Sequence, residues 1–304
     1  MTAEPVIIAQ PPATTEVPAT VRASLSPSRA ADFKTCPLLY RLRSIDRLPE
    51  RTTVEQARGT LVHAVLERLF DLPAADRTPT AAGDLVAPQW DRLVTEEPEL
   101  ADLFDGAEPQ AGEDFLRSAT ALLEGYFTVE DPRRLEPAER EALISAVVDD
   151  ELLIRGYLDR LDVAPDGALR VVDYKTGGAP REAFEARALF QLKFYALVLW
   201  RTRGVVPRVL RLLYLRDAEV CDYTPDAEEL ARFERTVVAL WRAIEQATER
   251  QDFRPRPSRL CDWCSHQAHC PSFGNTPPPF PVTAAPAGPL PDARTAATEA
   301  VPEE

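Results

Sequence analysis

The chain has 304 residues, with 35 basic and 49 acidic side chains and a net charge of −14. Hydrophobic residues make up 45% and charged residues 28%, which excludes a wholly disordered, collagen-like or coiled-coil chain. The longest apolar run, 194–200, is far too short to span a bilayer. The first residues, MTAEPVIIAQPPATT, contain no readable secretory signal, so we expect a cytoplasmic protein without a membrane partner.

The excess of acids is concentrated in one part of the chain. Residues 71–114 carry twelve acids and two arginines. A solvated acidic face is the ordinary interpretation, and shielding of non-substrate surface or mimicry of DNA is the functional alternative. Outside this run and the two ends the charges balance, so a nucleic-acid partner is allowed although the net charge argues against one. The balanced part contains one basic stretch: Arg41, Arg43, Arg47, Arg51 and Arg58.

Lysine is rare, and its positions exclude one class of enzyme. Only Lys34, Lys175 and Lys193 are lysines, and none of them follows a glycine. A phosphate-binding P-loop needs a Gly-Lys pair, so the chain is not an ATP-driven motor of that class.

Composition divides the chain into a folded core and two ends. Residues 1–23 and 274–304 are rich in Pro and Ala with few large apolar groups, which predicts disordered tails around a core at 24–273. Ser26 is placed to cap a helix that starts at Pro27. Residues 53–70 have apolar side chains at helical spacing, and 71–127 indicates a helical insertion of two or three acidic helices.

Strand signals begin near residue 141 and run to 163, and a Pro-Asp-Gly turn at 165–167 precedes a further strand at 168–176. The pattern returns to a helix at 181–203, then to a strand or hairpin at 206–224, and ends in a long helix at 225–250. This order predicts an α/β fold with a mixed sheet flanked by helices.

The turn at 165–167 brings polar residues of two strands together. An antiparallel pair closed by this turn places Asp159 opposite Asp173, with Lys175 on the same face. Two adjacent carboxylates favour a bound cation, and oxygen ligands suit Mg²⁺ or Mn²⁺. The alternative is a pair of edge-strand acids for which Lys175 is a salt-bridge partner.

Four strings occur in an order that is typical of one family: GTLVHAVLE (59–67), IRGYLDRLD (154–162), VVDYKTG (171–177) and QLKFY (191–195). Over residues 24–273 the sequence resembles the RecB-like branch of the PD-(D/E)XK nuclease superfamily, whose motifs are a helix His, a G-x-x-D strand, a D-x-K strand and a Q-x-x-x-Y helix. The resemblance implies a restriction-endonuclease-like core with a divalent-metal site.

The residues that the resemblance assigns to this site follow its motifs. It implies that the metal is held by His63, Asp159, Asp173 and the carbonyl of Tyr174, with Asp162 as an alternative acid. It also implies that Lys175 is the catalytic lysine and that Gln191 and Tyr195 support it. A divalent ion lowers the pKa of a bound water and polarises a phosphoryl oxygen, so these roles suit phosphodiester hydrolysis.

The five cysteines form a second pattern. Without a secretion signal a disulfide framework is not expected, and the spacing Cys261-x2-Cys264-x5-Cys270 within 253–273 favours metal ligands. Zinc could add His266 or His269. The resemblance extends to iron–sulfur members of the family, including AddB-type nucleases, and implies a [4Fe–4S] cluster that joins Cys36 to the three C-terminal cysteines as a structural staple. Cys221 is expected to be a small buried hydrophobe.

The sequence therefore predicts a metal-dependent DNA nuclease, an exonuclease acting on single strands or duplex ends in repair or recombination, with a separate helicase as a possible partner. A CRISPR-adaptation nuclease shares the same motifs and is an alternative. A non-catalytic DNA-binding partner with a zinc-bound C-terminal module is the alternative from another class.

Overall fold

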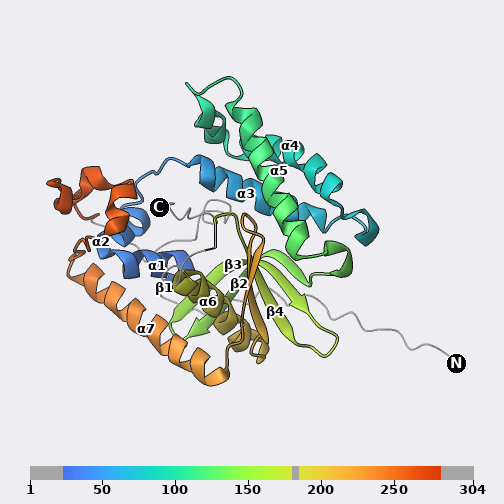
Figure 1. Ribbon diagram of the computed structural model, residues 1–304. Coiled ribbons are helices and arrows are strands. Elements are labelled where there is room, and N and C mark those ends of the chain that lie inside the picture. The colour runs from blue at the N-terminus through green and yellow to red at the C-terminus, as the bar shows by residue number, and fades with distance from the viewer. Residues whose placement is uncertain (1–22, 180–184, 282–304) are drawn as a thin grey trace.

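A six-stranded mixed sheet forms the centre of the computed structural model, which describes residues 23–179 and 185–281 (Figure 1). Most of the two expected tails, 1–22 and 282–304, lies outside the described residues. The strand order is β1-β3-β4-β5-β6, and β2 pairs with the other edge of β3. The strands are β1 (Ala23–Leu25), β2 (Glu139–Val148), β3 (Leu152–Val163), β4 (Leu169–Lys175), β5 (Val209–Tyr214) and β6 (Glu219–Tyr223).

The register between β3 and β4 is the one that the turn at 165–167 predicts. Arg160 pairs with Val172, and the antiparallel ladder continues to the turn. The longer run of strand signals is divided by a second hairpin, where Asp149 and Asp150 adopt φ angles of 50° and 58°. Positive φ at two central residues is typical of the tight turns that join antiparallel strands. Both hairpins thus fix the alignment of β3 with its neighbours.

One edge of β3 is split between two partners. Because β2 occupies the other edge from Leu152 to Leu161, β1 and β4 must share the remaining one. The parallel strand β1 pairs only with residues 152–154, and β4 begins to pair at Arg160. On this edge, residues 155–159 have no partner among the described strands. We call residues 155–159 the β3 gap.

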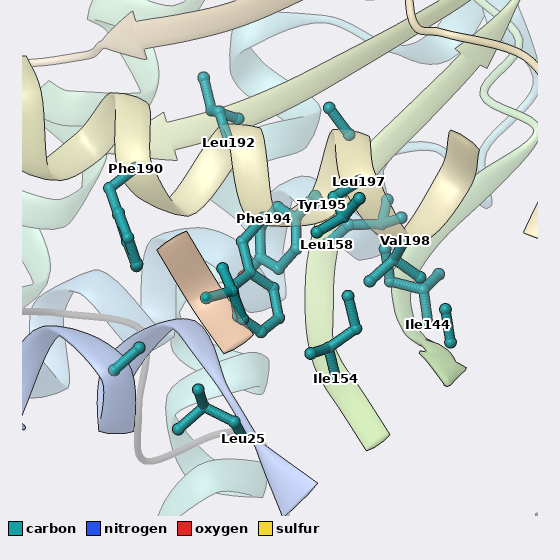
Figure 2. Close-up of a cluster of buried hydrophobic side chains, with 14 of the residues drawn as sticks. Leu25, Ile144, Ile154, Leu158, Phe190, Leu192, Phe194, Tyr195, Leu197 and Val198 are labelled. Carbon is teal, nitrogen blue, oxygen red and sulfur yellow. The ribbon is translucent and has the colours of Figure 1, made fainter. Parts of the chain in front are cut away.

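Helices α1 (Pro27–Thr35), α6 (Glu185–Arg203) and α7 (Ala227–Glu249) cover one face of the sheet (Figure 1). As predicted, Ser26 caps α1, and its Oγ accepts from the backbone N–H of Arg29. Figure 2 shows apolar side chains of α6 beside those of the sheet. The labelled residues include Leu25, Ile144, Ile154, Leu158, Phe190, Phe194, Tyr195 and Leu197.

Helices α3 (Val54–Leu69), α4 (Pro79–Glu96) and α5 (Ala111–Val129) cover the other face, with a 3-10 helix at Pro98–Phe104 between the last two. The predicted insertion therefore forms helices with an apolar core of its own, which packs on α3 and on β4 and β5. A Cβ at Gly125 would lie 2.0 Å from the carbonyl oxygen of Leu215, so only glycine permits this approach of α5. Many of the acids are exposed, among them Asp84, Asp91, Glu99, Asp102 and Asp105.

The cysteine segment 253–273 lies beside α2 (Pro37–Tyr40) and consists mainly of 3-10 turns (Figure 1). After it, Phe280 stacks on Phe253 with ring centroids 6.0 Å apart, and the guanidinium of Arg41 lies 5.1 Å from the centroid of the Phe280 ring. The described start of the expected C-terminal tail thus contacts the core. No helix among the described residues has the length and hydrophobicity needed to cross a membrane.

Candidate active site

His63 connects α3 to the sheet. The helix begins with a capping box, in which Thr53 and Gln56 satisfy each other's backbone N–H groups, and this fixes where its turns lie. His63 is 6% exposed, and its Nε2 lies 3.0 Å from the carbonyl oxygen of Tyr174 in β4. Its Nδ1 lies 3.7 Å from Oδ2 of Asp159. The imidazole therefore contacts two of the groups that the sequence predicts as its neighbours.

Asp159 is the last residue of the β3 gap. Where a strand ladder would continue, the backbone N–H of Tyr174 donates to Oδ2 of Asp159 at 2.7 Å. Both backbone polar groups of Tyr174 are consequently engaged, the N–H by Asp159 and the carbonyl by His63. Tyr174, the middle residue of the D-x-K motif, thus holds His63 and Asp159 at fixed positions.

Glu141 is a residue of this site that the sequence analysis missed. It lies opposite Asp159 in the register of β2 and β3, and one ligand atom from each of His63, Glu141 and Asp159 is within 4.8 Å of the other two. Its φ of 43° is unfavourable for a residue with a Cβ, and such strain occurs often at functional sites. The hairpin at Asp149 would have revealed this pairing from the sequence.

Asp173 and Lys175 face α6 rather than α3. The Nζ of Lys175 lies 2.8 Å from Oδ2 of the buried Asp173 and donates to Oε1 of Gln191 at 3.0 Å. The Nε2 of Gln191 then donates to the hydroxyl of Tyr195 at 3.0 Å. A Cβ at Gly156 would lie 2.8 Å from Tyr195, so the glycine of the G-x-x-D motif lets this helix approach β3.

The charges of the site are not balanced. Burial, followed by the carboxylates of Asp173 and Glu141, raises the pKa of Asp159. Burial lowers the pKa of His63, but Asp159 and Glu141 outweigh it and raise that pKa above its ordinary value. Asp173 Oδ2 is buried and makes no hydrogen bond to a described residue, although Lys175 is an ion-pair partner. Carboxylates that repel one another, together with an imidazole, form a set of ligands suited to a divalent cation.

Arg160 forms an ion-pair network behind this site. It is fully buried and donates to both oxygens of Glu130, at the end of α5, and to the hydroxyl of Tyr174 at 2.8 Å. Asp162, the alternative acid, accepts hydrogen bonds from Arg160 and Arg170. Asp162 thus belongs to the network that supports Tyr174, and Asp159 is the acid that lies beside His63.

The four cysteines of the second pattern line one cavity of about 50 Å³. Cys36 lies between α1 and α2. Its Sγ accepts a hydrogen bond at 3.3 Å from the backbone N–H of Arg256, which lies 220 residues further along the chain. Burial, with Cys261 and Cys270 adding to it, raises the pKa of the Cys264 thiol. Cys221 is half-buried in β6, packs against the main core and does not line this cavity.

Comparisons with known proteins agree with this arrangement. The family model of the PD-(D/E)XK nuclease superfamily matches residues 24–271. The Gene 69 protein of Mycobacterium phage D29 is 27% identical over 266 residues, which are 82% of this chain and 96% of the phage protein. A candidate exonuclease from Eubacterium rectale has a similar fold, with a TM-score of 0.51 and 11% identity, over 85% of this chain and 94% of the other.

A mixed sheet flanked by helices, with a histidine and two acids gathered where two strands separate and an acid–lysine pair beside them on β4, defines the class of protein as a nuclease with a restriction-endonuclease-like core. The chain belongs to the PD-(D/E)XK nuclease superfamily. Membership implies a hydrolase of phosphodiester bonds that uses a divalent metal.

Proposed function

We propose that this nuclease is a divalent-metal-dependent exonuclease that acts on DNA. The observation that carries the proposal is the meeting of His63, Asp159 and the Tyr174 carbonyl from three elements that lie far apart in the sequence. Such an enzyme suits the processing of DNA ends in repair or recombination, where a separate helicase can supply single strands.

In this proposal the metal is held by His63, Asp159, Asp173 and the carbonyl of Tyr174, as the motifs imply, and Glu141 is an additional acid of the site. The fit rests on the donor set itself. Burial, with the charges of Asp173 and Glu141 adding to it, raises the pKa of Asp159, and the buried Oδ2 of Asp173 is balanced only by its ion pair with Lys175 among the described residues. When bound, a divalent ion supplies a water of lowered pKa and polarises the phosphoryl oxygen.

Lys175 is the catalytic lysine of the proposal. Asp173 and Gln191 hold its ammonium in place. Because its side chain is 26% exposed, the ammonium is still accessible to a phosphate. From that position it can orient the attacking water or stabilise charge that develops on the phosphate. Tyr195 fixes Gln191 by accepting its amide N–H, and Gln191 in turn fixes the ammonium.

The cysteine cavity is proposed to hold a [4Fe–4S] cluster on Cys36, Cys261, Cys264 and Cys270. All four cysteines line the cavity. Among residues 23–179 and 185–281, however, no cysteine Sγ has two other potential ligand atoms of His, Cys, Asp or Glu so placed that all three lie within 4.8 Å of one another. Tetrahedral zinc with bonds of about 2.3 Å would place sulfurs about 3.8 Å apart, so the wider spacing favours a cluster over zinc.

The test is incubation of anaerobically purified full-length protein with end-labelled single-stranded and double-stranded DNA in Mg²⁺, Mn²⁺ or EDTA. An exonuclease releases the label as short products from one end, whereas an endonuclease gives internal fragments. Cleavage that depends on a divalent ion and stops in EDTA is the expected result. No cleavage of any DNA with either metal, by protein that is folded and loaded with iron, would contradict the proposal.

A further inference from the structure

Two successive residues of β2 contact the same helix. Oε1 of Glu141 lies 3.4 Å from Nδ1 of His63, and the next residue back, Arg140, donates to the carbonyl oxygen of Glu67 at 2.6 Å. His63 and Glu67 are four residues apart on α3, so both contacts lie on one face of that helix. Side chains of a regular strand alternate between the two faces of a sheet. The alternation of β2 is therefore interrupted between these two residues and the rest of the strand.

The interruption lies at Glu141. Ala142 and Ile144 pack in the core on the α6 side of the sheet, so an unbroken alternation would send Arg140 to that side as well. The chain departs from extended backbone at Glu141, whose φ is 43°. A residue with a Cβ adopts this conformation only where the surrounding structure holds it, and such residues are concentrated at functional sites.

Strand β3 changes face at the same level. Leu158 and Leu161 both pack in the core on the α6 side although they are three residues apart, so the two residues between them point the other way. The first of these is Asp159, which lies beside His63. The pairing of β2 with β3 continues on both sides of this level. The two strands thus change face together, and the change brings Glu141 and Asp159 to one imidazole.

The two ring nitrogens of His63 have different neighbours. Nε2 lies 3.0 Å from the carbonyl oxygen of Tyr174, and two ligands at right angles around Mg²⁺ with bonds of about 2.1 Å are about 3.0 Å apart. Nδ1 faces the acids instead. Oε1 of Glu141 is nearer to it than Oδ2 of Asp159, at 3.4 Å against 3.7 Å, and this Asp159 oxygen already accepts the backbone N–H of Tyr174. Glu141 is thus the acid beside the nitrogen that the metal does not use.

We propose that Glu141 is a positioning residue, which accepts the Nδ1–H of His63 and so presents Nε2 to the metal. The inference rests on the proposed function and gives Glu141 a role that acts through His63 and not as a ligand. A carboxylate on the second nitrogen of a metal-binding imidazole fixes its tautomer and its orientation and increases its basicity. The unfavourable φ of Glu141 is the conformation that brings the carboxylate to this nitrogen.

The first experiment measures Mn²⁺ binding by the full chain without DNA, from the EPR signal of the free ion. Glu141→Ala and Glu141→Gly remove the acceptor and should weaken Mn²⁺ binding by about 10-fold to 100-fold. Glu141→Gln keeps an acceptor oxygen and should weaken it by only about 3-fold. If Glu141 were a direct ligand, the Gln variant would lose as much affinity as the Ala variant, and the positioning role would be wrong.

Thermal melting separates this role from a contribution to the fold. Glycine tolerates a φ of 43°, so Glu141→Gly relieves the backbone while it removes the carboxylate. This variant should melt no lower than Glu141→Ala and still bind Mn²⁺ as weakly. The matched control is Glu219→Gln, which makes the Glu-to-Gln change at an exposed residue of β6 and should keep both the melting temperature and the Kd for Mn²⁺.

The second experiment observes His63 directly. The chain has three histidines, so ¹⁵N-histidine labelling gives a simple NMR spectrum, in which His266 and His269 are internal references. In the Mg²⁺-loaded parent protein and in Glu141→Gln, the Nδ1 proton of His63 should be visible because a hydrogen bond protects it. In Glu141→Ala and Glu141→Gly that signal should be lost through exchange with water. An unchanged His63 signal in these two variants would overturn the proposal.

The positioning role and the proposed function fail in different ways, because Mn²⁺ binding is measured without DNA. If the parent protein binds Mn²⁺ and cleaves DNA while Glu141→Ala and Glu141→Gly keep its Kd, the positioning role is wrong and the proposed function stands. If the variants lose Mn²⁺ affinity as expected but the parent protein cleaves no DNA, the proposed function is wrong and Glu141 still positions the metal ligand. A parent protein that does not bind Mn²⁺ would overturn both.

Discussion

In the candidate active site every predicted side chain comes from a regular helix or strand, whereas the cysteines come from a short 3-10 helix and from residues that flank short helices. His63 lies in the middle of α3, and Asp159 and Lys175 lie on strands of the central sheet. Cys36 separates α1 from α2, and Cys264 ends a 3-10 helix of five residues. The three 3-10 helices of the cysteine segment contain no buried residue.

This difference indicates what a metal does in each place. The candidate active site is held by the ladder of the sheet and by the hydrogen bonds of Tyr174, so the fold itself positions its side chains. The cysteine segment is anchored in the core by Phe253 at its start, and beyond it by polar contacts such as the ion pair of His266 with Glu50. We therefore expect removal of metal to cost activity in the first region and stability in the second.

The largest effect should come from the active site. Asp173→Asn and Lys175→Met remove the acid and the ammonium that the proposal places beside the metal and the substrate, so each should lower DNA cleavage by about 100-fold to 1000-fold. Because neither residue supports the apolar core, the melting temperature should change little. The measurement is the initial rate on end-labelled DNA with Mn²⁺ alongside thermal melting. A variant with the parent rate would contradict the assignment of these residues.

The second effect tests the cysteine cavity. The proposed cluster gives a brown absorbance near about 400 nm and about four irons per chain, and Cys36→Ser and Cys264→Ser should each lower both. Loss of the staple should lower the melting temperature by about 5–10 °C. Cys221→Ser is the matched control and should keep colour, iron and stability. A colourless protein with one zinc, sensitive to His269→Ala but not to Cys36→Ser, would establish the zinc alternative.

A smaller effect is expected from the network behind the active site. Tyr174→Phe removes the hydroxyl that accepts from Arg160 and leaves the backbone contacts to Asp159 and His63 in place. The lost hydrogen bond should lower the free energy of unfolding by about 1 kcal/mol. A shift of Tyr174 should also reduce cleavage several-fold, and the half-maximal rate should require a higher Mn²⁺ concentration. The control is Tyr126→Phe, whose buried hydroxyl makes no hydrogen bond to a described residue.

The smallest effect concerns the attachment of the cysteine segment. Burial raises the pKa of Glu50, but hydrogen bonds from His266 and Arg43 outweigh it and lower that pKa to about 2 from its ordinary value of 4.5. A depressed carboxyl pKa stabilises the fold fully above the ordinary value, and the contribution is lost as the pH falls towards about 2. The unfolding free energies of the parent and Glu50→Gln should therefore differ most near neutral pH and converge below about pH 4. A constant difference over this range would contradict the role of the charge.

The sequence by itself determined the elements and the chemistry of the motifs. The helical spacing of 53–70, the Ser26 cap and the turn at 165–167 are local signals, and each is confirmed by α3, α1 and the β3–β4 register. The register was predictable because a short turn aligns its two strands residue by residue. The residue types at the motifs likewise indicated a nuclease of the family that the comparisons support.

Only the tertiary structure decided which distant groups meet. Asp162 lies outside the site because Arg160 and Arg170 bind it. The β3 gap arises because β1 and β4 share one edge of β3, which no local pattern specifies.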